Sequence, residues 1–270
     1  MKYSANIGFL WDHLPLPERI LAAGRAGFDA VECHFPYDYS TAKLNEALNE
    51  AGLPMLGLNT ALGPEGAFGL AAIAGQETAA RELIDQAISY ASQLNVNHVN
   101  VVAGLTQGNP AATGVYVNNL RYACDEAAKL NKTIVIEPLN PRAVPGYHFS
   151  TVEAAVAIIE VVGKDNLKIM FDFFHAQIVQ GDLETLLRQH IGQIGHIQLS
   201  AVHDRGEPDS GEINYLYLLE VLNRLGYKGY IGAEYKPRQG SVEAGLGWLQ
   251  QFRNNISYCL LYTSPSPRDS

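Results

Sequence analysis

Short apolar runs and longer amphipathic segments alternate along nearly the whole chain. The short runs have the length of buried strands, whereas the longer segments repeat their apolar residues every three or four positions, as helices do. The pattern predicts eight strands, at residues 3–9, 28–32, 54–59, 97–102, 133–137, 167–172, 194–199 and 229–234. It also predicts eight helices, at residues 15–26, 41–51, 77–94, 113–131, 151–163, 182–190, 213–225 and 242–253.

Three of the predicted helices end at a glycine that leads directly into the next strand, at Gly27, Gly52 and Gly226. Glycine is common at this position because it adopts the left-handed conformation that ends a helix. Repeated helix-to-strand turns of this kind indicate parallel βαβ units. Eight units favour a (β/α)8 TIM barrel, with an open doubly wound sheet as the alternative. The sequence has no GxGxxG motif after the first strand and no GxxxxGK[ST] motif anywhere. Neither of the usual nucleotide-binding motifs therefore supports the open sheet.

The end of the chain departs from this pattern. Residues 255–270 close on a Ser- and Pro-rich segment with neither helical nor strand periodicity. We therefore expect one TIM-barrel domain over residues 1–254, followed by a tail at 255–270 that is foreign to the protein or disordered. Truncation after Asn254 should leave folding and activity intact.

Composition and charge narrow the class of protein. A chain of 270 residues, 47% of them hydrophobic, can bury the core of one large domain. The net charge of −9 argues against a nucleic-acid partner, which requires a basic face. The chain has neither a signal-peptide pattern nor an apolar run long enough to span a membrane. Cys33, Cys124 and Cys259 are too scattered for a disulfide framework or a zinc knuckle, so we expect a cytoplasmic protein. Because the outer helices of a barrel can carry apolar surface, the protein could form a homo-oligomer.

Four side chains with oxygen ligands stand at or near the ends of the last four predicted strands: Glu137, Asp172, Gln198 and Glu234. The carboxyl ends of barrel strands share one face and point towards a common centre. Buried polar groups are costly unless something satisfies them. Any one of the four could be a helix cap or an ion-pair partner, but four in series predict a site.

The chemistry of these four residues suggests a reaction class. An all-oxygen donor set suits Mg²⁺, or Mn²⁺, better than zinc. A metal that holds a substrate's hydroxyl and carbonyl oxygens acidifies the neighbouring C–H bond. Glu137 and Glu234, three strands apart in the ring, could remove and return that proton. The expected reaction is aldose–ketose isomerisation or epimerisation.

Longer motifs add a resemblance that covers residues from about 3 to about 253. The segments are FDFFHAQIVQGDL, HIQLSAVHDRGEPDSGEINYLYLLEVL, GYIGAEYKPRQGSVEAGLGW, FDAVECHFPYDYST, LNTA, NNLRYACDEA and IEPLN. In these segments the chain resembles the hydroxypyruvate isomerase family, of the xylose-isomerase-like barrel group.

The resemblance implies interconversion of hydroxypyruvate and 2-hydroxy-3-oxopropanoate (tartronate semialdehyde). It implies metal contacts at Glu137, Asp172, Gln198 and Glu234, with Glu137 and Glu234 also serving as proton donor and acceptor. Related sugar epimerases generally carry histidine where Gln198 stands, so Gln198 favours the isomerase branch.

Three further residues are predicted to contact the substrate: His175, Arg205 and Lys236. His175 could instead be a structural histidine. Arg205 could bind the substrate carboxylate bidentately, or it could be a solvated loop residue. Lys236, together with Arg238, either adds positive charge to the site or balances an acidic surface.

Other residues are assigned to the surroundings of the site. Glu207, Glu212 and Asn214 are expected to order the loop after residue 199, and Glu212 could also cap the next helix. Trp11, Phe35 and Tyr37 could wall off the site from water, although core packing is expected for at least one of them.

Three alternatives stay open at this point. The nearest is a 2-oxo-tetronate isomerase, or another isomerase or epimerase of short sugar acids. An apurinic-site endonuclease with a zinc cluster would need several more histidine ligands at strand ends and a basic surface, and this chain offers neither. The third is a non-catalytic sugar- or metal-binding protein.

Overall fold

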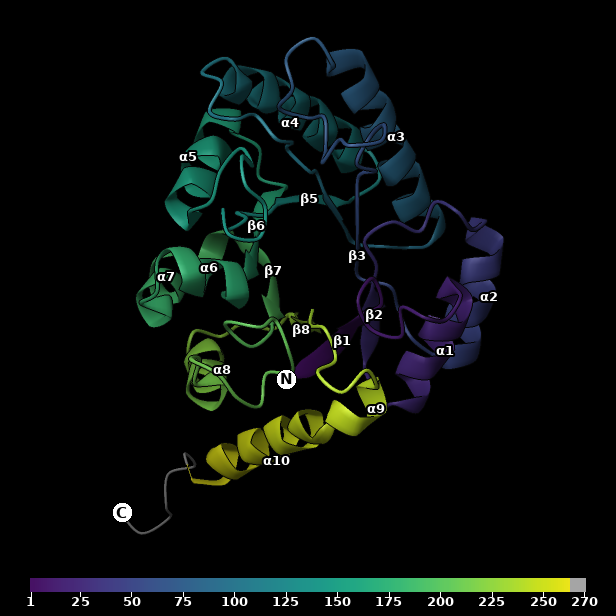
Figure 1. The fold of residues 1–270 in the computed structure, drawn as a ribbon, viewed down its shortest axis with the longest axis vertical. Coiled ribbons are helices and arrows are strands. Elements are labelled where there is room, and N and C mark those ends of the chain that lie inside the picture. The colour runs from purple at the N-terminus through teal and green to yellow at the C-terminus, as the bar shows by residue number, and fades with distance from the viewer. Residues whose placement is uncertain (263–270) are drawn as a thin grey trace, which may run out of the picture.

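Eight parallel strands form a nearly closed barrel surrounded by helices (Figure 1). The structure, a computed structural model, describes the backbone of residues 1–262 and the side chains of residues 1–254. The expected (β/α)8 TIM barrel is therefore confirmed. The eight strands are β1 (Lys2–Asn6), β2 (Ala30–Glu32), β3 (Gly57–Asn59), β4 (His98–Asn100), β5 (Thr133–Ile136), β6 (Leu167–Asp172), β7 (Ile194–Leu199) and β8 (Tyr230–Ala233).

The ring of strands closes between β2 and β3. The hydrogen-bonded order runs β2-β1-β8-β7-β6-β5-β4-β3, so β2 and β3 are its two ends. A single parallel bridge joins Val31 to Met55 across this gap. The amide of Val31 donates to the Pro54 carbonyl at 3.0 Å, and the amide of Leu56 donates to the Val31 carbonyl at 2.8 Å. These bonds bring the second strand next to the third and complete the barrel wall.

The helices largely follow the predicted ranges: α1 (Leu16–Arg25), α2 (Thr41–Ala51), α3 (Glu77–Gln93), α4 (Ala112–Ala128), α5 (Val152–Val162), α6 (Phe173–Val179), α7 (Leu183–His190), α8 (Tyr215–Arg224), α9 (Val242–Gly245) and α10 (Gly247–Tyr262). Two differences stand out. The predicted last helix is divided into α9 and α10 at Leu246, which lies between two glycines. Apart from proline, glycine has the lowest propensity for a helix. The other difference is α6.

Helix α6 lies where no helix was predicted. It is only seven residues long and its first four residues are all buried, so it lacks the amphipathic period of a surface helix. It starts directly after β6 because Asp172 acts as its N-cap, with Oδ1 accepting a hydrogen bond from the Phe174 amide at 2.8 Å. Asp172 is thus both the end of a strand and the start of a helix.

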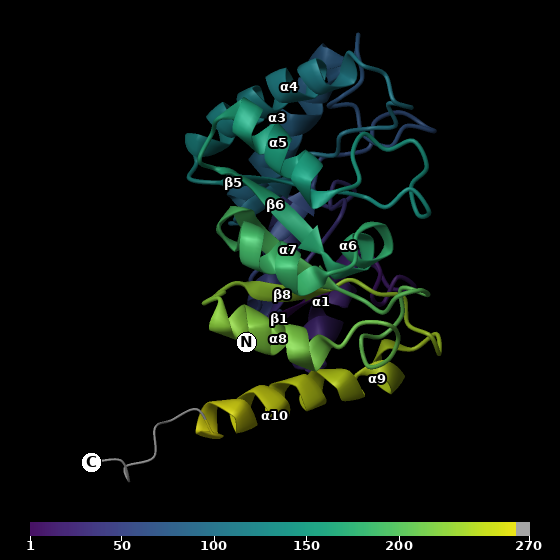
Figure 2. The same ribbon diagram turned by 90° about the vertical axis from the view of Figure 1, so that its left-hand side faces the viewer.

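Helix α10 packs along one side of the barrel (Figure 2). Trp248 and Phe252 are buried, and their rings lie 5.8 and 6.4 Å from the ring of Tyr3. The helix runs on into the predicted tail at 255–270 as far as Tyr262. Residues 263–270 lie outside the part that the structure describes, so the foreign or disordered tail stays a prediction.

Two findings bear on the expectations from composition. Cys33 and Cys124 are both buried and free, whereas the side chain of Cys259 lies outside the described part. In the region that the structure covers, no helix combines the length and apolar character needed to cross a lipid bilayer.

The long connections that follow the strands gather on one side of the molecule, the right-hand side of Figure 2. This is the side at which the strands end, because every strand pair is parallel. Side chains at the strand ends therefore share one mouth of the barrel, which is where barrel enzymes carry their sites.

Candidate active site

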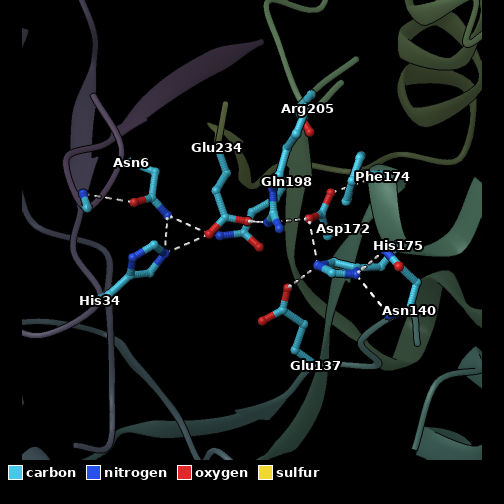
Figure 3. A network of polar contacts seen from close by, with 12 residues as sticks. Asn6, His34, Glu137, Asn140, Asp172, Phe174, His175, Gln198, Arg205 and Glu234 are labelled. Carbon is cyan, nitrogen blue, oxygen red and sulfur yellow. Dashed lines mark hydrogen bonds and ion pairs between the residues drawn. The ribbon is translucent and has the colours of Figure 1, made fainter. Parts of the chain in front are cut away.

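The strand register brings the four predicted strand-end residues to the same mouth of the barrel (Figure 3). Asp172 on β6 is level with Gln198 on β7, while Glu137 and Glu234 come directly after β5 and β8. All four are buried. Glu137, Gln198 and Glu234 also line one small cavity at the centre of the barrel. Residues spread over almost a hundred positions thus meet around one point.

Arg205 lies between two of the carboxylates. Its Nη2 donates to Glu234 Oε2 at 2.6 Å and to Asp172 Oδ2 at 3.1 Å. Its guanidinium is also stacked between the rings of Phe9 and Phe174, at 5.1 and 4.8 Å from the ring centroids. Such stacking and paired hydrogen bonding require the planar guanidinium group. The alternative of a solvated loop arginine is therefore wrong.

His175 is held in one defined tautomer. The backbone amide of Asn140 donates to its Nδ1 at 2.9 Å, and the Asn140 side-chain nitrogen lies 2.8 Å from the same atom. A backbone N–H can only donate, so the neutral ring carries its proton on Nε2. That atom lies 3.6 Å from Asp172 Oδ2 and 3.9 Å from Glu137 Oε1. His175 thus offers a hydrogen-bond donor to the centre of the site.

The three carboxylates have different electrostatic surroundings. Burial, followed by the charges of Glu234 and Asp172, raises the pKa of Glu137 well above its usual range. Burial raises the pKa of Asp172 to about 7, against the opposing effect of Arg205. Burial acts in the same direction on Glu234, but the charge of Arg205 and the hydrogen bond from His34 outweigh it and lower the pKa to about 2. Two carboxyl groups that face one cavity therefore differ in their affinity for a proton.

The donor set fits a divalent cation. Glu137, Asp172 and His175 each place one potential ligand atom within 4.8 Å of the others. Gln198 Oε1 is buried and has no hydrogen-bond partner among the described residues, although its Nε2 donates to Glu32 Oε1 at 2.8 Å. An unsatisfied buried carbonyl oxygen could serve as a further ligand of a metal ion.

A cavity of about 180 Å³ opens above these groups. Its deep end carries Glu137, His175, Arg205 and Glu234. Its outer wall is mostly apolar, with Phe9, Phe35, Leu62, Phe68, Val102, Leu139, Val144 and Tyr147. A small polar molecule could therefore bind at the deep end while the apolar wall excludes water.

Lys236 lies farther out than the other two predicted substrate contacts. It is exposed, and its ammonium group is 5.6 Å from the ring centroid of Phe9, at the rim of the cavity. The described residues that line the cavity include His175 and Arg205 but not Lys236. The structure thus brings together two of the three, and leaves Lys236 at the entrance.

The loop after β7 is ordered by charge pairs. Arg238 bonds Asp204, Glu207 and Asp209, so it balances acidic residues and does not face the site. Glu207 is buried beneath it, as expected for a residue that orders this loop. The N-cap of α8 is Asn214 and not Glu212, because Asn214 Oδ1 accepts from the Tyr217 amide at 3.2 Å.

The three aromatic residues considered as walls have different positions. Phe35 lines the cavity and is 40% exposed. Trp11 is buried in the core, and its Nε1 donates to Glu243 Oε1 at 2.6 Å. Tyr37 packs against Tyr90, with ring centroids 5.0 Å apart. Core packing for at least one of them is thus confirmed, and Phe35 is the one that faces the cavity.

Sequence reasoning missed several polar residues on the first four strands and the loop after β2. Glu32 and Asn6 are buried near the barrel axis, and His34 Nε2 lies 2.7 Å from Glu234 Oε1. Asn100 Nδ2 lies 3.4 Å from Glu137 Oε2. The signal for Glu32 was present, because it closes an apolar run just as Glu137 does. The prediction used this signal, a carboxylate at the end of an apolar run, only in the second half of the chain.

Comparison with known proteins identifies the family. Residues 20–252 match the model of the xylose isomerase-like TIM barrel family. The chain belongs to this family. As a member, it is 41% identical to a 2-oxo-tetronate isomerase of Cupriavidus necator, over 93% of this chain and 98% of that protein. It is 40% identical to a putative hydroxypyruvate isomerase of Mus musculus, over 93% of this chain and 95% of that protein.

A solved structure agrees closely with this chain in fold. It comes from Brucella melitensis and is described as an AP endonuclease of family 2. Its TM-score is 0.90 at 37% identity, over 93% of this chain and 98% of that chain. The resemblance inferred from the motifs is confirmed by these relatives, and so is the enzyme class, an isomerase.

Proposed function

We propose that the protein interconverts hydroxypyruvate and 2-hydroxy-3-oxopropanoate through a cis-enediolate, with Glu137 and Glu234 as the acid/base pair. One observation carries the proposal: both glutamates, with His175 and Arg205, line the deep end of one cavity. Two carboxylates on one cavity can abstract a proton beside a carbonyl and return it. The names of the relatives support the same reaction type.

Mg²⁺, or Mn²⁺, would be held by Glu137, Asp172, Gln198 and Glu234. When bound, the cation would stabilise negative charge on the substrate oxygens and so acidify the C–H bond next to the carbonyl. His175 belongs to the group of side chains that lie close enough to hold a metal ion. Its Nε2 carries the proton and can only donate, however, so His175 suits the substrate better than the cation.

The residues of the chain would move two protons. In the direction from hydroxypyruvate, one glutamate removes a proton from C3, and the other delivers a proton to C2. The proton of the C3 hydroxyl passes to the C2 oxygen, which gives the isomer. Exchange with solvent then takes the proton from the first glutamate and returns one to the second, so the enzyme is restored. Glu234, whose carboxylate is held by His34, Asn6 and Arg205, suits the role of base. Glu137, which lines the same cavity, would take the role of acid.

The remaining groups would orient the substrate. The guanidinium of Arg205 would bind the substrate carboxylate, and its Nε, which is buried without a partner among the described residues, supports this role. The Nε2–H of His175 would donate to the oxygen on which negative charge develops. The aromatic wall would keep bulk water from the enediolate, and a cytoplasmic setting would suit such an enzyme.

The test is an NMR assay of hydroxypyruvate in deuterated buffer, with and without a chelator. We expect product formation with deuterium at carbon, and loss of both when the chelator is added. Glu137→Gln and Glu234→Gln should each lower turnover by about 10²–10⁴-fold. Glu212→Gln, in the exposed part of the nearby loop, is the control and should retain activity. Full isotope exchange in both site variants would contradict the two-glutamate mechanism.

A 2-oxo-tetronate isomerase is the second candidate. It is favoured by the name of the Cupriavidus necator relative. Values of kcat/KM for both acids, measured on one preparation, would decide between them. A zinc endonuclease is less favoured, because the candidate metal group within the described residues contains only one histidine.

A further inference from the structure

Glu32, at the end of β2, binds four polar groups in the interior of the barrel. Its Oε1 accepts from Asn6 Nδ2 at 3.2 Å and from Gln198 Nε2 at 2.8 Å. Its Oε2 accepts from Ser4 Oγ at 3.0 Å and from His196 Nε2 at 2.5 Å. A buried carboxylate is costly unless its oxygens are hydrogen-bonded, and each oxygen of Glu32 accepts two hydrogen bonds.

The bond to Glu32 decides which end of the Gln198 amide faces the site. An ionised carboxylate only accepts hydrogen bonds, so the NH₂ group of Gln198 must be the end that faces Glu32. The opposite orientation would place two oxygen atoms 2.8 Å apart. Gln198 Oε1 is then left on the other side, buried and without a partner among the described residues.

The Glu32 carboxylate is also linked, through Asn6, to Glu234, the proposed base. Asn6 Nδ2 donates to Glu32 Oε1 and also to Glu234 Oε1 at 3.0 Å. The orientation of the Asn6 amide is fixed in turn, because its Oδ1 accepts from the Gly8 backbone amide at 3.0 Å. Glu32 thus bonds to two amides, one of which is a proposed ligand and the other a partner of Glu234.

We propose that Glu32 is a positioning residue that fixes the Gln198 amide with its oxygen towards the candidate metal site. This deepens the proposed function and rests on it, because it assigns Gln198 to the cation. Groups that orient metal ligands from behind typically change metal affinity by about 10–100-fold when they are removed. Glu32 acts on the site only through Gln198 and Asn6, so it is not a catalytic residue.

The test compares Mn²⁺ affinity, by titration calorimetry, in the full chain and in three variants. Glu32→Met removes every acceptor at similar length and should weaken Mn²⁺ binding by roughly tenfold or more. Glu32→Gln can donate to Ser4 and still accept from Gln198, so affinity should stay within about threefold. Asn119→Leu removes a different buried hydrogen bond, to the Ala71 carbonyl, and should leave Mn²⁺ affinity unchanged.

A second readout needs no metal. The side-chain amide resonances of Gln198 should shift in Glu32→Met and stay near their original positions in Glu32→Gln. Unchanged amide resonances and unchanged Mn²⁺ affinity in Glu32→Met would overturn the inference. If the original protein bound no Mn²⁺ but the amide still depended on Glu32, the proposed metal would be wrong and the positioning role would stand.

If Glu32→Met does not fold, the contact can be tested instead by exchanging the side chains of residues 32 and 198. Gln198→Glu alone brings two carboxylates together and should lower the thermal midpoint. Adding Glu32→Gln restores one donor and one acceptor, so the double variant should recover at least half of the loss. Strictly additive effects of the two substitutions would contradict the contact on which the inference depends.

Discussion

Gly232 leaves the space that the Glu32 carboxylate occupies in the barrel interior. A Cβ atom added to Gly232 would lie 2.5 Å from Glu32 Oε1 and 2.6 Å from Oε2. Gly232 is also level with Gln198 in the neighbouring strand. The missing side chain on β8 therefore allows a charged side chain from β2 to reach the amide on β7.

Gly232→Ala should displace Glu32 and destabilise the protein by about 1–3 kcal/mol, the usual cost of overpacking a core. Mn²⁺ affinity should fall with it. Gly114→Ala is the matched control, since nothing lies within 4 Å of the added Cβ in α4. This control should raise stability by about 0.5–1 kcal/mol, because alanine favours a helix more than glycine does. Denaturant unfolding measures both, and equal effects would contradict the steric argument.

Arg205→Lys should raise KM for hydroxypyruvate more than it lowers kcat. Lysine keeps the charge but loses the planar, two-pronged hydrogen bonding that a carboxylate prefers. A hydrogen bond to a charged group contributes ~1.5–3 kcal/mol, so KM should rise by about tenfold or more. The control is Arg188→Lys on α7, where the pair with Glu184 is far more exposed. An unchanged KM in Arg205→Lys would exclude the proposed carboxylate contact.

His175 should stay neutral, with its proton on Nε2, throughout the range from pH 8 to pH 5 in the metal-free protein. Burial, followed by the charge of Arg205, lowers its pKa to about 3. The amide of Asn140 keeps Nδ1 unprotonated. Imidazole ¹⁵N chemical shifts report both properties directly. A proton on Nδ1, or titration between pH 6 and pH 7, would contradict the assigned tautomer.

The free energy of unfolding should fall as the pH drops below 6.5, in part because of His98. Burial, and then the charge of His196, lowers the pKa of His98 well below its ordinary value of 6.5. The folded state keeps His98 neutral, whereas the unfolded chain binds a proton there once the pH is below 6.5. The unfolded state is therefore favoured in acid, with a slope that approaches ~1.4 kcal/mol per pH unit. Denaturant unfolding of His98→Gln between pH 7 and pH 5 should show a shallower dependence, and an identical slope would refute this role.

Truncation after Asn254 should leave the thermal midpoint and the isomerase activity unchanged. The shortened chain keeps Trp248 and Phe252, which pack against Tyr3, and Arg253, which bonds the carbonyl of Gly27 at 2.8 Å. These contacts tie α10 to the barrel before residue 255. Differential scanning calorimetry of both chain lengths checks the expectation, and a lower midpoint would show that the segment from 255 onwards contributes to folding.

The sequence was sufficient for the barrel and for part of the site. Eight alternating strands and helices can bury their apolar faces together only in a few ways, and the turns at Gly27, Gly52 and Gly226 favoured the parallel arrangement. Helix α6 was missed because local burial and the Asp172 cap create it, not an amphipathic period. Strand ends such as Asn6 shifted because the chain turns back, with the Leu10 amide bonded to the Asn6 carbonyl at 3.0 Å.

What the sequence alone determined is which oxygen-bearing residues stand at or near the ends of the last four strands, since periodicity marks approximately where each strand ends. It could not determine how those side chains divide the work, because hydrogen bonds across 166 positions, such as that between Glu32 and Gln198, arise only when the ring of strands closes. Only the tertiary structure decided that Arg205 lies between two carboxylates, that His175 is a donor and that Gly232 makes room for Glu32. The physical reason is that strand-end identity is a local property, whereas burial, tautomer and amide orientation depend on neighbours that folding alone brings together.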